Sequence, residues 1–354
     1  SSYSLKGITY AGITRACGLT DKSGVLLPPS QCAAEVEKTF RKPTWTLALD
    51  YDLFEDTLVY AAARSGYRSG AINNSAINPT VVTAKPEDVQ DYEVGVKSAW
   101  SLGGVPLRTN LALYHSDYRD IQIQTSLPNI TLATAPGVPG GVCTQAAFNA
   151  GQCLGSTNDP VTLNARKARI DGVELSIAAK PTPEFRFEFS GSYLNASYTD
   201  YTFTPPAGYL LPSGRVDLSG TPFPLPKVQL NGGVTYSPPI RQLASVTFDG
   251  IDLSYRVYHQ SRFEADMRTF NPMQQTSSYA MSDVRLDLIG INSRNVDLSL
   301  FAKNIFNEEA CIPEQQGVLN SAPNGTFGIA GASGALQCIP LPPRMAGATL
   351  RVGF

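Results

Sequence analysis

The sequence has few charges, few histidines and no long apolar run. Charged residues make up 16% of its 354 residues, whereas about 25% is usual for a soluble domain. The net charge is -2, which leaves no electrostatic basis for binding DNA or RNA. No run of about 18 apolar residues is present, so we expect no transmembrane helix. The chain also opens without Met or the apolar segment of a signal peptide, which favours a mature or truncated chain.

Patterns of catalytic and metal-binding residues are missing as well. The sequence holds no HExxH motif, no glycine-rich phosphate loop and no CxxC pair. Its two histidines are His115 and His259. Ser116 and Asp117 follow His115, but neighbours along a strand point to opposite faces, so these three residues cannot form a triad among themselves. We expect no enzymatic activity, no metal site and no cofactor.

The sequence does show a hydrophobic period of two, over many segments, which indicates β-strands. In residues 185–193, for example, Phe185, Phe187 and Phe189 alternate with Arg186 and Glu188. About twelve such segments are expected, near residues 3–15, 39–53, 56–69, 89–101, 105–125, 165–180, 184–200, 226–238, 244–262, 278–291, 295–307 and 343–354. Helical spacing is nowhere as persistent, so the predicted fold class is all-β.

Short and long connections alternate between these segments. Short turns include LFED, LGGV and KPTPE, whereas the long connections have about 20 residues after Gly70, 35 after Thr125, 25 after Asp200 and 35 after Asn307. A large soluble all-β protein has no reason for this asymmetry. Outer-membrane barrels have short periplasmic turns and long extracellular loops. The pattern therefore favours a transmembrane antiparallel β-barrel with several membrane-crossing strands.

Alternate residues along the predicted strands form a polar face that carries many charges, and we expect this face to line a wide lumen. The residues are Arg64, Arg68, Glu93, Lys97, Arg108, Glu174, Arg186, Glu188, Asp252, Arg256, Asp283, Arg285, Asp287, Lys303 and Arg351. A small barrel filled by its own side chains could not hold them, because each charge needs a partner or water. A lumen filled by water or by a polar plug could.

Six cysteines fall in pairs inside the long connections. They allow fifteen pairings, but the local pairing keeps each bridge within one connection. We therefore predict the disulfides Cys17–Cys32, Cys143–Cys153 and Cys311–Cys338. Such bridges persist in the periplasm and at the cell surface. A zinc site is the rival, and the spacing of the cysteines speaks against it.

Six stretches of the sequence resemble the barrel of TonB-dependent outer-membrane receptors, in the family's order. They read LVYAAARSGYRSGAINN, KPEDVQDYEVGVKSAW, LRTNLALYHSDYRDIQIQ, RIDGVELSI, FAKNIFNEE and PRMAGATLRVGF. The matching positions of the first three are Arg64, Gly66, Tyr67, Arg68, Ser69, Gly70, Asn73, Pro86, Glu87, Tyr92, Glu93, Gly95, Lys97, Ser98, Tyr118, Asp120, Ile121 and Gln122. The resemblance spans nearly the whole chain.

This resemblance implies a 22-strand barrel around an N-terminal plug, energised by TonB and its inner-membrane complex. Residues 1–354 would then be the C-terminal portion of the barrel domain, without the plug and the first strands. A second chain or an omitted segment would supply that N-terminal half. A self-closed 12-strand barrel is the rival. Open sheet edges are not viable in lipid, so we predict that residues 343–354 pair with an absent strand and not with residues 3–15.

The resemblance implies an outer-membrane receptor that binds a scarce small solute and imports it to the periplasm. An iron–siderophore-like complex, cobalamin or a saccharide would be the cargo, and outer-membrane lipid would surround the barrel. A passive porin is the alternative. Candidate ligand contacts at the extracellular ends of the lumen are Arg68, Tyr118, Gln122, Gln124, Tyr198 and Tyr258. Arg64, Glu93 and Lys97 are expected to lie deeper and to pair with one another or with the plug.

The last strand ends on an aromatic residue. In residues 346–354, Leu350, Val352 and Phe354 share the apolar parity, and Thr349 and Arg351 share the other. Terminal Phe354 resembles the signal that barrel-assembly machinery recognises in its substrates. We predict that deleting it impairs insertion more than it weakens the folded barrel.

Overall fold

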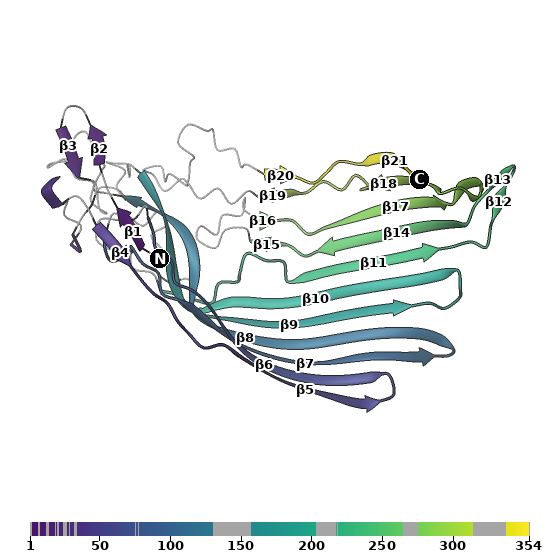
Figure 1. The fold of residues 1–354 in the computed structure, drawn as a ribbon, viewed down its shortest axis with the longest axis horizontal. Coiled ribbons are helices and arrows are strands. Elements are labelled where there is room, and N and C mark those ends of the chain that lie inside the picture. Colours follow the sequence, from purple (N-terminus) through teal and green to yellow (C-terminus); the bar gives the residue numbers. More distant parts are fainter. Residues whose placement is uncertain are drawn as a thin grey trace.

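One curved antiparallel sheet of eleven strands dominates the molecule, which is described here from a computed structural model (Figure 1). The structure describes residues 2–5, 8–11, 14–17, 19, 21–23, 27, 29–31, 34–74, 76, 78–129, 157–202, 217, 219–264, 275–313 and 338–353. The sheet strands are β5 (Trp45–Phe54), β6 (Thr57–Arg68), β7 (Glu87–Leu102), β8 (Val105–Asn129), β9 (Thr157–Ala179), β10 (Phe185–Asp200), β11 (Val228–Tyr236), β14 (Gly250–Gln260), β17 (Tyr279–Ile289), β18 (Val296–Lys303) and β21 (Met345–Val352). Each strand pairs with the strands before and after it along the sheet, from β5 to β21. The predicted all-β, antiparallel fold is confirmed.

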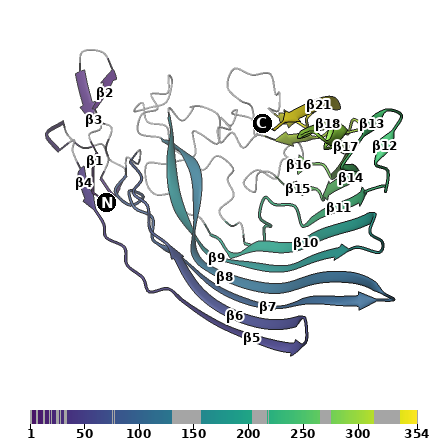
Figure 2. The same ribbon diagram turned by 45° about the vertical axis from the view of Figure 1, so that its right-hand side comes forward.

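The connections at the two ends of the strands differ in length, as predicted. At one end, β5 and β6 are joined through Glu55 and Asp56, and β7 and β8 through Gly103 and Gly104. At the other end lie the long connections after β6, β8, β10, β14 and β18. Figure 2 shows β8 and β9 rising far above their neighbours at this second end. These tight turns contain residues with a positive φ angle, which is 63° at Asp56 and 60° at Gly103.

The register gives the sheet one apolar face and one polar face. Directly opposed residues on the apolar face include the row Tyr51, Val59, Val96, Leu111 and Leu175, which crosses five strands. The row Lys97, Asn110, Ser176, Ser190, Asn231 and Tyr258 crosses six strands on the polar face. All the charges assigned to the polar parity by sequence lie on the polar face. Because the period of a strand is two, this agreement also fixes which residues share each face.

The segment near residues 3–15 is not a strand of the sheet. It contains three short strands, β1 (Ser2–Leu5), β2 (Ile8–Ala11) and β3 (Thr14–Cys17). β1 pairs with β4 (Ala34–Glu37), and β2 pairs with β3. Four-residue strands are too short to cross a bilayer, which needs about 9–11 residues. The prediction of a crossing strand here was wrong, and the first strand of the sheet is β5.

The remaining described elements are short. They are the hairpin of β12 (Gln242–Leu243) and β13 (Val246–Thr247), the pair β15 (Phe263–Glu264) and β16 (Gln275–Thr276), the pair β19 (Cys311–Pro313) and β20 (Cys338–Pro340), and the 3-10 helices Pro29–Gln31 and Ile291–Ser293. Within the described residues, no helix is long and apolar enough to cross a membrane.

Strands β5 and β21 form the two edges of the sheet. Within the described residues, β5 pairs only with β6 and β21 only with β18, so the sheet does not close on itself. In the described parts of residues 343–354 and 3–15, no backbone pairing joins the two segments. Each edge presents a row of backbone N–H and C=O groups without a strand partner in this part of the chain.

Three glycines on the polar face lie directly opposite aromatic residues. The opposed pairs are Gly95 with Tyr60, Gly172 with Tyr114, and Gly347 with Phe301. A Cβ at Gly95 would come within 2.5 Å of the Tyr60 ring, and at Gly347 within 2.6 Å of the Phe301 ring. Each ring therefore occupies space that only glycine leaves free on the neighbouring strand.

Candidate functional site

A network of ions and hydroxyls covers the polar face between β6 and β8. The Arg64 guanidinium donates to Asp91 Oδ1 at 2.6 Å and to Glu93 Oε2 at 2.9 Å. The Tyr60 hydroxyl donates to Glu93 Oε1 at 2.7 Å, and the Ser116 hydroxyl donates to Asp91 Oδ2 at 3.0 Å. We call these five residues the paired network. Charge-assisted hydrogen bonds hold both carboxylates, so their remaining capacity to bind a ligand is small.

Lys97 lies beside the paired network without joining its ion pairs. Its ammonium lies 5.1 Å from the centroid of the Tyr60 ring, which is within the range of a cation–π contact. Arg64 and Glu93, which the sequence placed with Lys97 in one group, contact each other directly. Asp91, Tyr60 and Ser116 were missed, because their places beside Arg64 and Glu93 follow only from the strand register, which sets Asp91 between Arg64 and Ser116.

Further along the polar face, from β8 to β14, several charges have no side-chain partner among the described residues. These are Arg108 on β8, Glu174 on β9 and Arg256 on β14, which we call the unpaired charges. They border two adjoining hollows of about 550 and 440 Å³, whose walls also include Asn110, Ser176, Ser190 and Asn231. The unpaired charges are exposed. This region can therefore accept a polar partner without first breaking its own contacts.

The connection after β6 is fastened to β9 by one asparagine. Asn73 is 5% exposed, and its side-chain amide donates to the carbonyls of Val81 (2.7 Å) and Thr162 (2.9 Å). Its Oδ1 accepts a hydrogen bond from the Thr162 N–H at 2.8 Å. A small core of Ala76, Val81, Val82 and Val161 lies beneath it. We call this the Asn73 clamp. It shapes the surface at the end of the sheet that carries the long connections.

Gln122 and Asn164 fasten the same connection from β8 and β9. The side-chain amide of Gln122 donates to the carbonyls of Ser69 (2.7 Å) and Lys85 (3.1 Å). Asn164 accepts from the Lys85 N–H at 2.8 Å and donates to the Asp120 carbonyl at 2.7 Å. Both amide donors of Gln122 are thus used within the protein. Of the six candidate ligand contacts, Gln122 therefore has a structural role in this geometry.

Tyr118 and Tyr198 belong to an aromatic cluster near the long connections. Tyr198 is 5% exposed, and its ring centroid lies 5.2 Å from that of Tyr201 and 4.6 Å from that of Phe223. Tyr118 packs against the same cluster. Along β10, Tyr198 lies five residues beyond Tyr193, the residue at which the apolar surface of this strand ends. Burial raises the pKa of the Tyr198 hydroxyl. A neutral hydroxyl in this apolar cluster is a packing element.

The other three candidate ligand contacts are Arg68, Gln124 and Tyr258, of which the first two are exposed. Arg68 and Gln124 have no side-chain partner among the described residues, and Arg68 is exposed. The Tyr258 hydroxyl accepts from Gln229 at 3.2 Å and donates to Gln260 at 2.8 Å, and the centroids of the Tyr258 and Tyr279 rings are 6.1 Å apart. Tyr258 also lines the larger of the two hollows beside the unpaired charges. The structure does not gather the six candidates into one pocket.

His115 and Ser116 point to opposite faces of the sheet. The imidazole of His115 contacts Asp171 and Asp117 on the apolar face, whereas Ser116 hydrogen-bonds to Asp91 on the polar face. This arrangement agrees with the expectation that His115, Ser116 and Asp117 form no triad. Within the described residues, no group of three or more His, Cys, Asp or Glu side chains is arranged to hold a metal ion.

The predicted disulfides and the C-terminal phenylalanine lie outside the part of the chain that the structure describes. This holds for Cys32, Cys143, Cys153 and Phe354 as whole residues, and for the side chains of Cys17, Cys311 and Cys338. The backbones of β19 and β20 pair, which brings the strands of Cys311 and Cys338 side by side. The three disulfides and the role of Phe354 stay predictions.

Three solved structures that share this fold are named as uptake receptors or transporters. The ferric yersiniabactin uptake receptor FyuA from Yersinia pestis is 16% identical, with a TM-score of 0.57 over 87% of this chain and 37% of that one. The siderophore receptor PiuA from Acinetobacter baumannii is 15% identical, with a TM-score of 0.57 over 92% and 38%. The copper transporter OprC is 13% identical, with a TM-score of 0.56 over 93% and 42%. At these identities the likeness establishes the fold, and the chain spans about two fifths of the length of these structures.

The family of this chain follows from a match to a protein-family model. No curated protein sequence matches the chain. Residues 20–305, however, match the model described as "TonB dependent receptor-like, beta-barrel". Proteins of this family are receptors and transporters of the outer membrane of Gram-negative bacteria. The chain belongs to the family of TonB-dependent receptor-like β-barrels.

Proposed function

We propose that this chain is the C-terminal portion of the barrel of an active-transport receptor, which binds a scarce solute outside the cell and imports it with TonB-coupled energy. The observation that carries the proposal is the polar face between β8 and β14. Its unpaired charges Arg108, Glu174 and Arg256 border hollows and have no side-chain partner among the described residues. Charges in a membrane protein need partners or water. A polar plug inside the barrel would supply both partners and a gate.

The two open edges support a larger barrel. Unsatisfied backbone groups in hydrocarbon cost several kcal/mol each, so strands outside residues 45–352 must cover β5 and β21. In this proposal residues 1–354 form one barrel domain portion, and the N-terminal half of the receptor brings the plug and the remaining strands. That half is either a second chain or part of the same one. Mass measurement of the reduced, denatured receptor distinguishes them, since only a split receptor gives two bands.

The solute would be an iron–siderophore-like complex, cobalamin or a saccharide. One structural neighbour is named as a ferric yersiniabactin uptake receptor, a second as a siderophore receptor and a third as a copper transporter, which favours a metal complex. Arg68 and Gln124 are proposed solute contacts because both are exposed and have no side-chain partner among the described residues, and Tyr258 is proposed because it lines the larger hollow beside the unpaired charges. Tyr118, Gln122 and Tyr198 would shape the site by holding the surrounding connections.

Uptake by the full-length receptor tests the proposal. Radiolabelled ferric siderophores, cobalamin and oligosaccharides are offered to cells that depend on this receptor, with and without TonB. We expect accumulation of one solute class that requires TonB and falls in an Arg68→Ala, Tyr258→Phe double variant. TonB-independent diffusion of small solutes into liposomes containing the receptor would contradict active transport and establish the porin alternative.

A further inference from the structure

Strands β8 and β9 continue beyond the rest of the sheet as a two-stranded arm. Residues 121–129 of β8 pair with residues 157–165 of β9 in one antiparallel register, and we call this segment the β8–β9 arm. The neighbouring strands do not accompany it, because β7 begins at Glu87 and β10 ends at Asp200. A two-stranded ribbon is only marginally stable in water. The direction of the arm therefore depends on the contacts at its base.

Asp120 bends β8 where the arm begins. Its φ of 51° lies in the left-handed region, which aspartate and asparagine tolerate better than other residues that carry a side chain. In a regular strand Tyr118 and Ile121 would point to opposite faces. Here both pack against the aromatic cluster around Tyr198, so the left-handed residue between them reverses the alternation along β8. In Figure 2, β8 and β9 turn away from the direction of their neighbours at this end.

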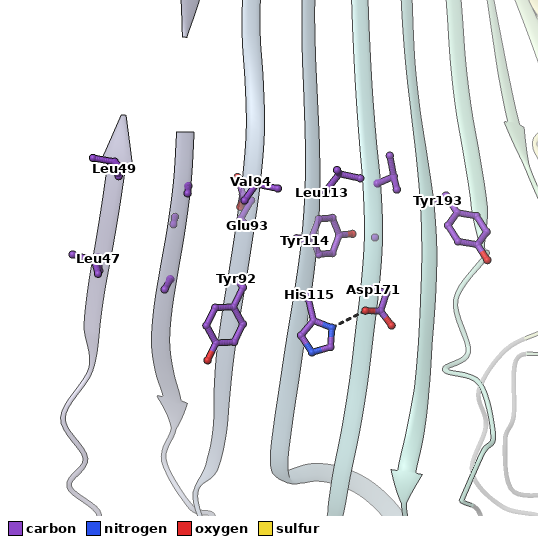
Figure 3. A pocket seen from close by; sticks show the side chains of 15 residues that line it. Leu47, Leu49, Tyr92, Glu93, Val94, Leu113, Tyr114, His115, Asp171 and Tyr193 are labelled. Carbon is purple, nitrogen blue, oxygen red and sulfur yellow. Dashed lines mark hydrogen bonds and ion pairs between the residues drawn. The ribbon is translucent and has the colours of Figure 1, made fainter. Parts of the chain in front are cut away.

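The two strands are joined by side chains below the bend. On the apolar face, His115 Nδ1 of β8 lies 2.6 Å from Asp171 Oδ1 of β9 (Figure 3). One row closer to the arm, Arg169 Nε lies 3.8 Å from Asp117 Oδ1. These contacts hold β8 beside β9 up to the bend, so the arm leaves the sheet from a fixed base.

The beginning of β7 completes the hydrogen bonds of the bent strand. Pro86 has no N–H, and the pairing of β7 with β8 stops at Asp88 and Arg119. The side chain of Glu87 then takes the place of a strand, because its Oε2 accepts a hydrogen bond from the backbone N–H of Gln122 at 2.6 Å. We call this hydrogen bond the latch. It joins the second and third of the family-like stretches of the sequence immediately beyond the bend.

The latch also sets the relative position of two proposed solute contacts. Arg68 lies directly opposite Glu87, and the Gln122 side chain donates to the carbonyl of Ser69 at 2.7 Å. Gln124 follows two residues later on the arm and is exposed. Arg68 on β6 and Gln124 on the arm are therefore held relative to each other through Glu87 and Gln122.

We propose that Asp120 and Glu87 are positioning residues for solute binding, which bend and fasten the β8–β9 arm so that Arg68 and Gln124 contact the same solute molecule. This inference rests on the proposed function. The left-handed residue supports it, because such backbone conformations persist only where surrounding contacts hold them, and they are concentrated at functional sites. Asp120 and Glu87 need not touch the solute, since both act through the position of Gln124.

Substitutions at Asp120 test the bend. Asp120→Gly and Asp120→Asn permit the left-handed conformation, whereas the β-branched side chain of Asp120→Val opposes it. In the full-length receptor, Asp120→Val should speed hydrogen exchange at the Gln122 amide by roughly tenfold or more, and the two permissive variants should stay near the wild-type rate. Asp120→Asn also removes the ion pair with Lys85, whose atoms are 3.8 Å apart, and so shows that this exposed pair is not the cause. Unchanged exchange in β14 and β17 confirms that each variant is folded.

Uptake of radiolabelled ferric siderophores, cobalamin and oligosaccharides gives the functional test. For the probe that the wild type accumulates, Asp120→Val and Glu87→Ala should raise the half-saturating concentration by roughly fivefold or more. The maximal rate should not change, because the barrel and its energy source are intact. Glu87→Gln keeps an acceptor oxygen for the Gln122 N–H and should restore binding to near the wild-type level.

Three outcomes would overturn the inference. Asp120→Gly as impaired as Asp120→Val would show that the side chain matters and not the bend, and equal exchange at Gln122 in all variants would show that the bend does not hold the latch. Faster exchange at Gln122 in Asp120→Val with an unchanged half-saturating concentration would separate the arm from solute binding and leave the transport proposal intact. If the wild type accumulates none of the probes in a TonB-dependent manner, the proposed function itself fails and the positioning role fails with it.

Discussion

The paired network of β6 to β8 and the unpaired charges of β8 to β14 are two regions of the same polar face. In the first region Arg64 faces Asp91 and reaches Glu93, so the charges satisfy one another. In the second, Arg108 lies opposite Ala99 and Ala178, and Glu174 lies opposite Ala112 and Ser192. Arg256 lies opposite Gly233 and Asp283, but among the described residues no ion pair joins it to Asp283, whose Oδ1 accepts a hydrogen bond from the Asn304 N–H. The two regions differ in which side chains contact one another and not in the kinds of residue they contain. Polar side chains that contact one another stabilise their part of the sheet, whereas those without a side-chain partner remain available to contact a plug or a ligand.

If the role of a polar residue depends on its hydrogen bonds and ion pairs, the stability lost when it is replaced should increase with the number of those contacts. Asn73 has three hydrogen bonds in a buried position, so Asn73→Ala should have the largest effect. We expect the connection after β6 to lose about 2–4 kcal/mol of local stability, because buried backbone groups lose their partners. Hydrogen exchange at the amides of Ala84 and Thr162 would then be faster by roughly thirtyfold or more. Asn231→Ala, at an exposed asparagine with no side-chain hydrogen bond among the described residues, is the control.

Arg64→Met should have an intermediate effect on the barrel. It leaves Asp91 and Glu93 close together without a cation, but the Arg64 side chain is 41% exposed, so water screens part of the repulsion. We expect a loss of about 1 kcal/mol in the free energy of unfolding in lipid vesicles. Adding Glu93→Gln should recover part of it. A double variant less stable than Arg64→Met alone would show that the carboxylates do not repel each other.

Arg108→Met makes the matched comparison at an unpaired position. The same substitution should change the free energy of unfolding of the barrel by no more than about 0.5 kcal/mol. In the full-length receptor it should instead speed hydrogen exchange in the plug, if the proposed plug contacts this wall. A loss of barrel stability equal to that of Arg64→Met would break the distinction between the two regions.

The smallest effect is expected at Tyr198, and only in alkali. Burial raises the pKa of its hydroxyl in the folded protein, whereas in the unfolded chain a tyrosine ionises near pH 10. The unfolded state therefore releases this proton first as the pH rises above about 10, and the stability that the neutral hydroxyl contributes below that pH is lost. Tyr198→Phe should make the decline of stability between pH 9 and 11 shallower. A Tyr198→Phe variant whose stability declines as steeply as that of the wild type between pH 9 and 11 would contradict this account.

The two faces of the sheet could be predicted from sequence, but the contacts on them could not. Alternation alone assigned Arg64, Glu93 and Arg108 to the polar face, because side chains in a strand have a period of two. It could not pair Arg64 with Asp91, since a long connection separates β6 from β7 and no local turn fixes their register. For the same reason the contacts of Asn73 and Asn164, which fasten the connection after β6, could not be predicted, although Asn73 matched a position of the family motif.

The first residues were misjudged for a different physical reason. The alternation in residues 3–15 is that of a strand, but a pattern does not reveal whether the strand lengthens to cross a membrane or folds back on itself. Here Thr14–Cys17 turns back onto Ile8–Ala11. His115 shows the opposite case, because its strand and face were assigned correctly but its contacts were not foreseen. His115, Asp117 and Asp171 are polar residues on the apolar face, and the structure brings them into contact with one another.

The glycines opposite Tyr60, Tyr114 and Phe301 have a consequence for the space in front of the polar face. Because each ring leans over the strand beside it, three large side chains lie along the sheet instead of standing out from it. An alanine at Gly95 would collide with the Tyr60 ring and turn it away from the sheet. The free space over this part of the sheet thus depends on its smallest residues, which decide how closely the large ones lie against the strands.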